Sequence, residues 1–104
     1  MPSVSIPDLL AEVEVPREGT LSRVVYKDDR VRLVVFAFDT DQELTEHRSS
    51  SAAIVQVPQG SIEFTVDGAT HHLTPSSWLY MDPDEPHSLV AREPSILLLT
   101  MLRG

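Results

Sequence analysis

The chain has 104 residues, enough for one domain with a single hydrophobic core. Its 16 acidic residues outnumber its 8 basic ones and give a formal net charge of -8, which argues against binding to nucleic acid or to an anionic membrane surface. The chain has no cysteine, which excludes disulfides, thiolate catalysis and cysteine-based zinc sites.

The beginning of the chain, MPSVSIPDLLAEVEVPREG, contains neither a basic segment nor a long apolar one, so it lacks the pattern of a secretory signal. The longest apolar runs, near residues 31–38 and 96–102, are too short to cross a lipid bilayer. Together with the absence of cysteine, these features lead us to expect a cytoplasmic protein.

One helix is predicted, near the start of the chain, at about residues 6–13. Ser5 can cap it, Pro7 suits its first turn, an apolar stripe follows, and Pro16 ends it. No other segment of the chain shows a helical period.

The region from about residue 20 to residue 102 consists of short strand-like segments separated by turn signals. The segment DTDQELTEH is predicted to be a polar loop, and Asp67-Gly68 is predicted to form a tight hairpin. About eight short strands with frequent turns predict an all-β, antiparallel jelly-roll barrel, whose interior can hold side chains or one small ligand. The predicted strands are residues 21–26, 31–38, 52–57, 61–66, 70–73, 78–81, 87–91 and 95–102.

Four histidines are candidates for a functional site. His71 and His72 are adjacent on one predicted strand, so their side chains point to opposite faces and cannot bind one ion together. Their simplest interpretation is as solvated strand residues. His47 and His87 each follow a polar or proline-rich turn, where a strand begins, and such positions face the open end of a barrel.

Two segments around these histidines resemble the motifs of the cupin superfamily. In LTEHRSSSAAIVQVPQG, His47 matches the first histidine of the first cupin motif and Gly60 matches its final glycine. PSSWLYMDPDEPHSLVA is similar to the second motif, with His87 as its histidine. The resemblance covers roughly residues 31–102 and implies that the chain, residues 1–104, is a single cupin domain.

The resemblance also implies a cavity for a small organic ligand, lined by His47, Ser49, Ala53 and His87. If residues 45–53 are extended, the odd-numbered ones line one face, which the cupin pattern makes the inner face. The small residues on that face would leave space for a ligand. In the alternative without a ligand site, the serine run is a mobile loop and the two histidines are buried structural groups.

The family's metal sites use three histidines and a glutamate, and the resemblance implies His47 and His87 as ligands here. Ser49 replaces the second histidine and Ala53 replaces the glutamate. Two imidazoles alone would hold a divalent ion such as zinc, nickel, iron or manganese only weakly. Candidates for a third ligand are Gln42, Glu46 and Glu85.

The apolar runs at residues 31–38 and 96–102 exceed what one barrel interior can cover. Because cupins commonly pair through their sheets, we expect a homodimer. Trp78 and Tyr80 share one strand face and are interpreted as core or interface residues rather than as ligand contacts.

Two functional classes remain open. The first is a small-molecule-binding cupin of unknown ligand, with a weak divalent-metal site and with catalysis undecided. The alternative is a non-enzymatic sensing or binding module with structural histidines and no metal. No residue is assigned a catalytic role from the sequence.

Overall fold

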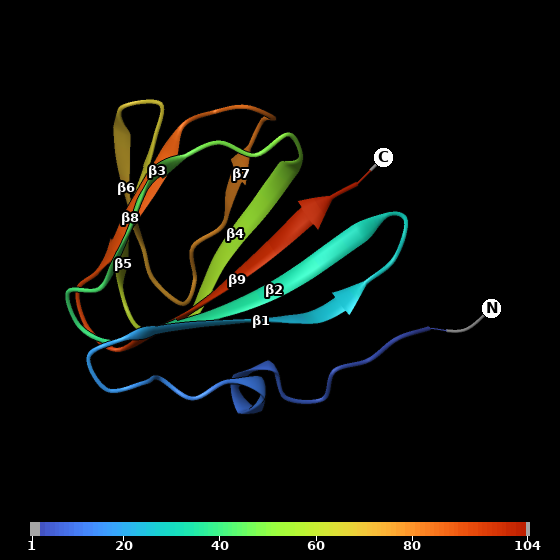
Figure 1. Ribbon diagram of the computed structural model, residues 1–104, viewed down its shortest axis with the longest axis horizontal. Coiled ribbons are helices and arrows are strands. Elements are labelled where there is room, and N and C mark those ends of the chain that lie inside the picture. Colours follow the sequence, from blue (N-terminus) through green and yellow to red (C-terminus); the bar gives the residue numbers. More distant parts are fainter. Residues whose placement is uncertain (1–2, 104) are drawn as a thin grey trace.

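The structure is a computed structural model that describes residues 3–103, and this part of the chain forms two antiparallel sheets (Figure 1). One sheet has five strands in the order β1-β2-β9-β4-β7, and the other has four in the order β3-β8-β5-β6. The predicted all-β, antiparallel architecture is confirmed. The strands are β1 (Thr20–Lys27), β2 (Val31–Phe38), β3 (Glu43–His47), β4 (Ala52–Gln59), β5 (Ile62–Val66), β6 (Ala69–Leu73), β7 (Leu79–Met81), β8 (His87–Ala91) and β9 (Ser95–Leu102).

The main hydrophobic core fills the space between the two sheets. It contains Phe38, Val55 and Leu97 from the five-stranded sheet and Ile62 and Phe64 from the four-stranded sheet. In β5 the burial alternates residue by residue, as the sequence pattern predicted, so one face of this strand points into the core.

The turn between β5 and β6 is formed by Asp67 and Gly68, which have φ angles of 47° and 82°. These positive values are the reason that aspartate and glycine suit the two positions. The predicted hairpin is confirmed, and it places β6 at the edge of the four-stranded sheet.

Gly60, between β4 and β5, is required by its surroundings. Its φ angle is 96°, and a Cβ atom at this position would lie 2.6 Å from the carbonyl oxygen of Pro94. Ser95 holds the same corner, because its hydroxyl accepts a hydrogen bond from the backbone N–H of Ser61 at 3.0 Å. Glycine therefore allows β4 to turn tightly against the start of β9.

The predicted helix is shorter than expected. It is a single 3-10 turn, η1 (Leu9–Glu12), and the side chain of Asp8, rather than Ser5, caps it by accepting from the N–H of Leu10 at 3.1 Å. Val13 follows in an extended conformation, which carries its side chain onto the sheet. Within residues 3–103, no helix is long and apolar enough to cross a membrane.

The segment before β1 packs along the outer face of the five-stranded sheet (Figure 1). Its Val13 is buried in a second, smaller core with Val35 and Ala37 of β2 and Ile96 of β9. Both faces of β2 are therefore apolar because one faces the main core and the other faces the N-terminal segment. A second protomer was expected to cover this whole outer face, but the N-terminal segment supplies part of the cover.

One strand was missed in the sequence. β3 (Glu43–His47) lies within the segment that was predicted to be a polar loop, and it pairs with β8 at the edge of the four-stranded sheet. Its side chains are mostly exposed, so the sequence has no apolar alternation to reveal it. Pairing with β8, rather than intrinsic preference, makes this segment a strand.

Candidate functional site

His47 and His87 are brought together at one end of the four-stranded sheet. His47 is the last residue of β3 and His87 is the first of β8, and the two are register partners on these neighbouring strands. Their Nε2 atoms are 3.0 Å apart, and the ring planes are inclined at 63°. His87 is buried, with 8% of its surface exposed, whereas His47 is exposed. The pair thus extends from the core to the barrel mouth.

A register shift in β3 aims His47 inward. Leu44 is paired with Leu89, but the next pair is His47 with His87, so β3 has one residue more than β8 between these pairs. Such a bulge changes which side chains share a face. As a result Leu44 and His47, three residues apart, both line the same cavity.

Both imidazoles are anchored through their other nitrogen. Nδ1 of His47 lies 3.0 Å from the carbonyl oxygen of Thr45, and Nδ1 of His87 lies 3.0 Å from the carbonyl oxygen of Glu85. A carbonyl oxygen only accepts hydrogen bonds, so each Nδ1 is assigned the proton. This assignment leaves the lone pair of each Nε2 directed at the other ring.

Two lone pairs at 3.0 Å repel each other unless something positive lies between them. One added proton lets one Nε2 donate to the other, and a metal cation would accept both lone pairs. A neutral pair can form the contact only if one ring gives up its Nδ1–H bond to a carbonyl. The geometry is therefore suited to holding one proton or one cation.

Burial decides which ring resists protonation. The pKa of His87 is lowered, first because burial penalises its charged form and also because of the positive charge of His47, against the opposing effect of the Glu85 carbonyl. The ring of Phe64 stacks on His87, with centroids 5.9 Å apart and planes 10° apart. These surroundings favour the neutral form of His87.

A small cavity lies directly behind the two rings. Its volume is about 30 Å³, which is room for a water molecule but not for an organic ligand. Except for the two histidines its walls are entirely apolar: Phe36, Leu44, Phe64, Leu89, Leu97 and Leu99. A larger ligand would therefore have to contact the imidazoles from the mouth of the barrel.

Ser49 and Ala53 lie apart from this cavity. The chain leaves the four-stranded sheet after His47 and enters the five-stranded sheet at Ala52, so residues 45–53 are not one extended segment. Ala53 is 2% exposed and is paired with Met81 and Met101 in the five-stranded sheet. Ser49 lies in the connecting loop, where its hydroxyl accepts from the N–H of Ser51 at 3.2 Å. Ala53 nevertheless faces the main core between the sheets, so the prediction that these positions line a ligand cavity together with the histidines stays a prediction.

The three candidates for a third metal ligand are placed as follows. Glu85 accepts a hydrogen bond from the N–H of Asp82 at 2.7 Å through Oε1, and Glu46 is exposed. The side-chain oxygen of Gln42 accepts from the hydroxyl of Thr20, the first residue of edge strand β1, at 3.5 Å. Among residues 3–103, no group of three or more His, Cys, Asp or Glu side chains is placed to hold a metal ion.

His71 and His72 are exposed on β6, and neither lines the histidine cavity. Nε2 of His72 is 2.6 Å from the hydroxyl of Ser61. Phe64 was missed as a site residue, since its place in the alternating strand showed only that it is buried. No sequence signal places its ring against His87.

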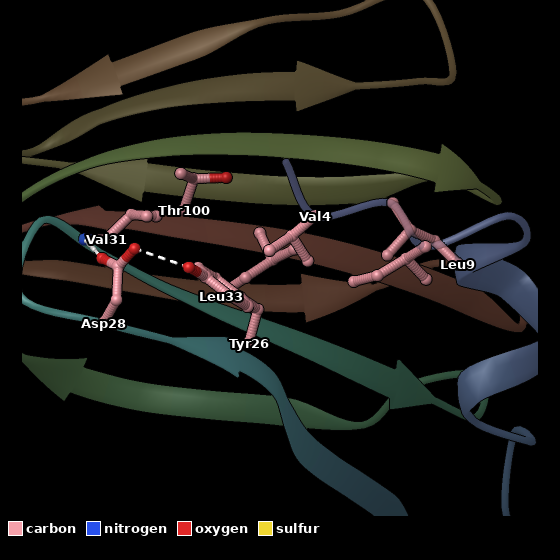
Figure 2. Close-up of a pocket in the computed structure, with 8 residues that line it drawn as sticks. Val4, Leu9, Tyr26, Asp28, Val31, Leu33 and Thr100 are labelled. Atoms are coloured by element: carbon pink, nitrogen blue, oxygen red, sulfur yellow. Dashed lines mark hydrogen bonds between the residues drawn. The ribbon is translucent and has the colours of Figure 1, made fainter. Parts of the chain in front are cut away.

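A larger and more open groove lies on the outside of the molecule. The N-terminal segment borders it with Val4 and Leu9, and the five-stranded sheet with Tyr26, Leu33 and Thr100 (Figure 2). Its volume is about 520 Å³, and the hydroxyl of Tyr26 donates to the carboxylate of Asp28 at 2.6 Å along one side. It lies on the opposite face of the sheet from the histidine pair and contains no imidazole.

Comparison with known families identifies the domain. The family model described as the AraC-like ligand-binding domain matches residues 32–102, which include both histidines and eight of the nine strands. The chain belongs to this family. No curated protein sequence matches the chain significantly.

Solved structures with the same fold cover nearly the whole chain. A conserved protein of unknown function from Streptococcus pyogenes is 28% identical, with a TM-score of 0.86 over 100% of this chain and 91% of that one. A cupin superfamily protein from Desulfitobacterium hafniense is 20% identical, with a TM-score of 0.86 over 100% and 95% of the two chains. A putative mannose-6-phosphate isomerase from Ralstonia eutropha is 17% identical, with a TM-score of 0.82 over 97% and 100%. The predicted cupin jelly roll is confirmed.

Proposed function

We propose that this domain binds a small molecule at the mouth of its barrel, where the ligand contacts the His47–His87 pair. The observation that carries the proposal is the convergence of two Nε2 atoms at 3.0 Å, each on a ring held by a backbone carbonyl. Membership of a ligand-binding domain family supports the same function. Because the cavity behind the rings is about 30 Å³, only a small head group or a single atom of the ligand enters it.

The two histidines also fit a weakly held divalent ion. Histidine ligands in metal sites usually donate their other ring N–H to a carbonyl or carboxylate, and both rings here do so. With two protein donors, affinity for zinc, nickel, iron or manganese would be low, and water or the ligand would complete the coordination shell. Such an ion would supply a Lewis acid that polarises an oxygen atom of the ligand.

The alternative is a non-enzymatic sensing or binding module with no metal. The replacement of two family ligand positions by Ser49 and Ala53 favours it, and so does the position of both residues outside the cavity. In that case the pair shares a proton and presents an N–H group or a lone pair to the ligand. In both versions, binding at the histidine pair is the function, and no catalytic residue is assigned.

Calorimetric titration with nickel tests the proposal. At pH 7.5 we expect the wild-type chain to bind one ion weakly, and His87→Ala to abolish the binding, since one imidazole alone is a poor site. His71→Ala is the matched control because it removes an exposed histidine outside the pair. Equal binding by all three proteins would contradict the assignment of the metal site.

If nickel does not bind to the wild-type chain, the version without metal remains and makes its own prediction. Small-molecule ligands found by screening would then lose affinity on His47→Ala and keep it on His71→Ala. Ligands insensitive to His47→Ala would contradict the placement of the site.

We further propose that the domain pairs through the outer face of its five-stranded sheet. Trp78 is 61% exposed and Tyr80 is 46% exposed on the edge of this sheet. Tyr80 is the register partner of Ile54, and Ile54 is the partner of Thr100 in β9. Thr100 borders the outer groove beside the N-terminal segment, whereas Ile54 and Tyr80 do not line that groove, so a second copy of the chain would bury them.

A further inference from the structure

Basic side chains gather at one end of the five-stranded sheet. Lys27 at the end of β1, Arg32 near the start of β2 and Arg103 after β9 border one hollow of about 260 Å³. The rest of its lining comes from Met101 and from the serines of the β3–β4 loop, residues 49–51. Three of the 8 basic residues of a chain with net charge -8 thus border a single hollow.

The hollow lies on the inner side of the sheet, beside the histidine cavity. Arg32 of β2 and Met101 of β9 are register partners. On the same faces of these strands, Phe36 lies four residues after Arg32 and Leu99 lies two residues before Met101. Phe36 and Leu99 both line the histidine cavity. Figure 1 shows the ends of β1 and β9 and the starts of β2 and β4 at the same side of the molecule. The basic hollow and the histidine pair therefore open at one mouth.

The three cations have few competing partners. Among residues 3–103, one ion pair is present, between Arg92 and Glu63, and neither residue borders this hollow. The nearby carboxylate of Asp28 accepts from the Tyr26 hydroxyl and from the backbone N–H groups of residues 30 and 31, and it lines the groove on the outer face. Arg103 uses one nitrogen to donate to the Asp28 carbonyl at 2.9 Å, which positions its guanidinium and leaves its other N–H groups available.

The serine loop supplies neutral donors and is held in place. The Asp84 N–H donates to the carbonyl of Ser49 at 2.7 Å, and Arg48 donates to the carbonyl of Asp84 at 3.1 Å. Ser49 accepts the N–H of Ser51 through its hydroxyl oxygen, so its own O–H remains free to donate. Cations with hydroxyl donors around a concave surface recognise anionic oxygens.

We propose that this mouth binds the carboxylate or phosphate group of a small organic anion, held by Lys27, Arg32 and Arg103 and by the serine hydroxyls. The inference deepens the proposed function and rests on it in one respect, that the ligand enters at the mouth shared with the histidine pair. The anionic group lies in the basic hollow, and the rest of the ligand extends past Met101 toward the imidazoles.

The test uses the full chain and simple probes. Amide spectra by NMR are recorded at pH 7.5 during titration with sodium phosphate, sodium acetate or sodium chloride at matched ionic strength. We expect phosphate or acetate to give saturable shifts at residues 49–51 and Arg103, and chloride to give none. Arg32→Gln should raise the dissociation constant of the bound anion at least about tenfold, because a charged hydrogen-bond partner is lost.

Arg17→Gln is the matched control, since it removes the same charge from an exposed arginine outside the hollow, and it should change the constant less than about twofold. Saturation by phosphate alone would assign a phosphoryl group, and saturation by acetate alone would assign a carboxylate. If both anions behave like chloride, or if Arg17→Gln weakens binding as much as Arg32→Gln, the inference is wrong. Phosphate binding that survives His87→Ala while nickel binding is lost would separate this site from the metal site.

Discussion

The histidine pair shows how little a residue's chemistry depends on its identity alone. His71 and His72 are exposed on an edge strand, whereas His87 is buried against Phe64 with its Nδ1 bound to a carbonyl. The same imidazole is a solvated surface group in one setting and half of a closely spaced pair in the other. Burial and one backbone acceptor make the difference.

The lowered pKa of His87 predicts a pH dependence of stability. The unfolded chain binds a proton at this residue below about pH 6.5, while the folded chain resists it, so the unfolded state binds more protons in the window below that value. The free energy of unfolding should therefore fall as the pH is lowered through this window. Urea unfolding at pH 7.5 and 5.5 measures it, and His87→Gln should lose less stability over the same interval. An equal loss in both proteins would assign the effect to other groups.

The crowded backbone at Gly60 leads to a second prediction for a single residue, which concerns the free energy of unfolding. Gly60→Ala should lower the free energy of unfolding by about 2–3 kcal/mol, because it combines a positive φ with a close approach to the Pro94 carbonyl. Gly68→Ala is the control, since its φ of 82° is also positive but nothing lies within 4 Å of the added Cβ. Its cost should be about 1 kcal/mol. Equal melting temperatures for the two variants would contradict the crowding at Gly60.

At the scale of elements, strands with an apolar pattern were predictable and the polar edge strand was not. β2, β8 and β9 occupy the predicted ranges, because their side chains fill the core on a regular register. β3 has no such pattern, and its bulge reverses the face on which His47 lies relative to Leu44. The motif resemblance placed the two histidines as neighbours, and they are in contact. Strand alternation could not reveal that the chain changes sheets between His47 and Ala52.

The N-terminal segment is expected to stabilise the outer face of the sheet. Val13→Ala should lower the free energy of unfolding by about 1–3 kcal/mol, because Val13 is buried against Val35, Ala37 and Ile96. Val4→Ala, at a residue that is 61% exposed in the same segment, should change it by less than about 0.5 kcal/mol. Urea unfolding distinguishes the two variants. A neutral Val13→Ala would show that the segment does not pack on the sheet in solution.

At the scale of the whole molecule, composition and turn spacing were sufficient to predict the fold class, while the proposed ligand site depends on contacts between distant segments. The basic hollow joins residues 27, 32, 49–51, 101 and 103, and no local pattern in the sequence indicates that these meet. Arg32 alone carries a signal, as the one charged residue within the apolar strand β2. The chain's overall negative charge conceals the local basic cluster.

The proposed dimer concerns the whole molecule and can be tested by its mass in solution. Sedimentation at micromolar concentration should give a species of about twice the 11.6 kDa chain mass. Ile54→Glu should shift it toward the monomer, because it places a charge in the middle of the outer face of the sheet. Val24→Glu is the control, with the same added charge at an exposed position on edge strand β1. A wild-type monomer, or the same shift in both variants, would contradict pairing through this face.

Two imidazoles with anchored Nδ1 atoms converge through Nε2, and we propose that they hold one proton or one cation. Long-range ¹H–¹⁵N NMR of the histidine rings measures this directly, by reporting the protonation of each nitrogen during a zinc titration at pH 7.5. We predict that Nδ1 of His47 and His87 is protonated throughout and that zinc shifts both Nε2 signals together, leaving His71 unchanged. An Nδ1 that lacks its proton in either ring, or Nε2 signals of the pair that move no more than those of His71, would contradict the claim.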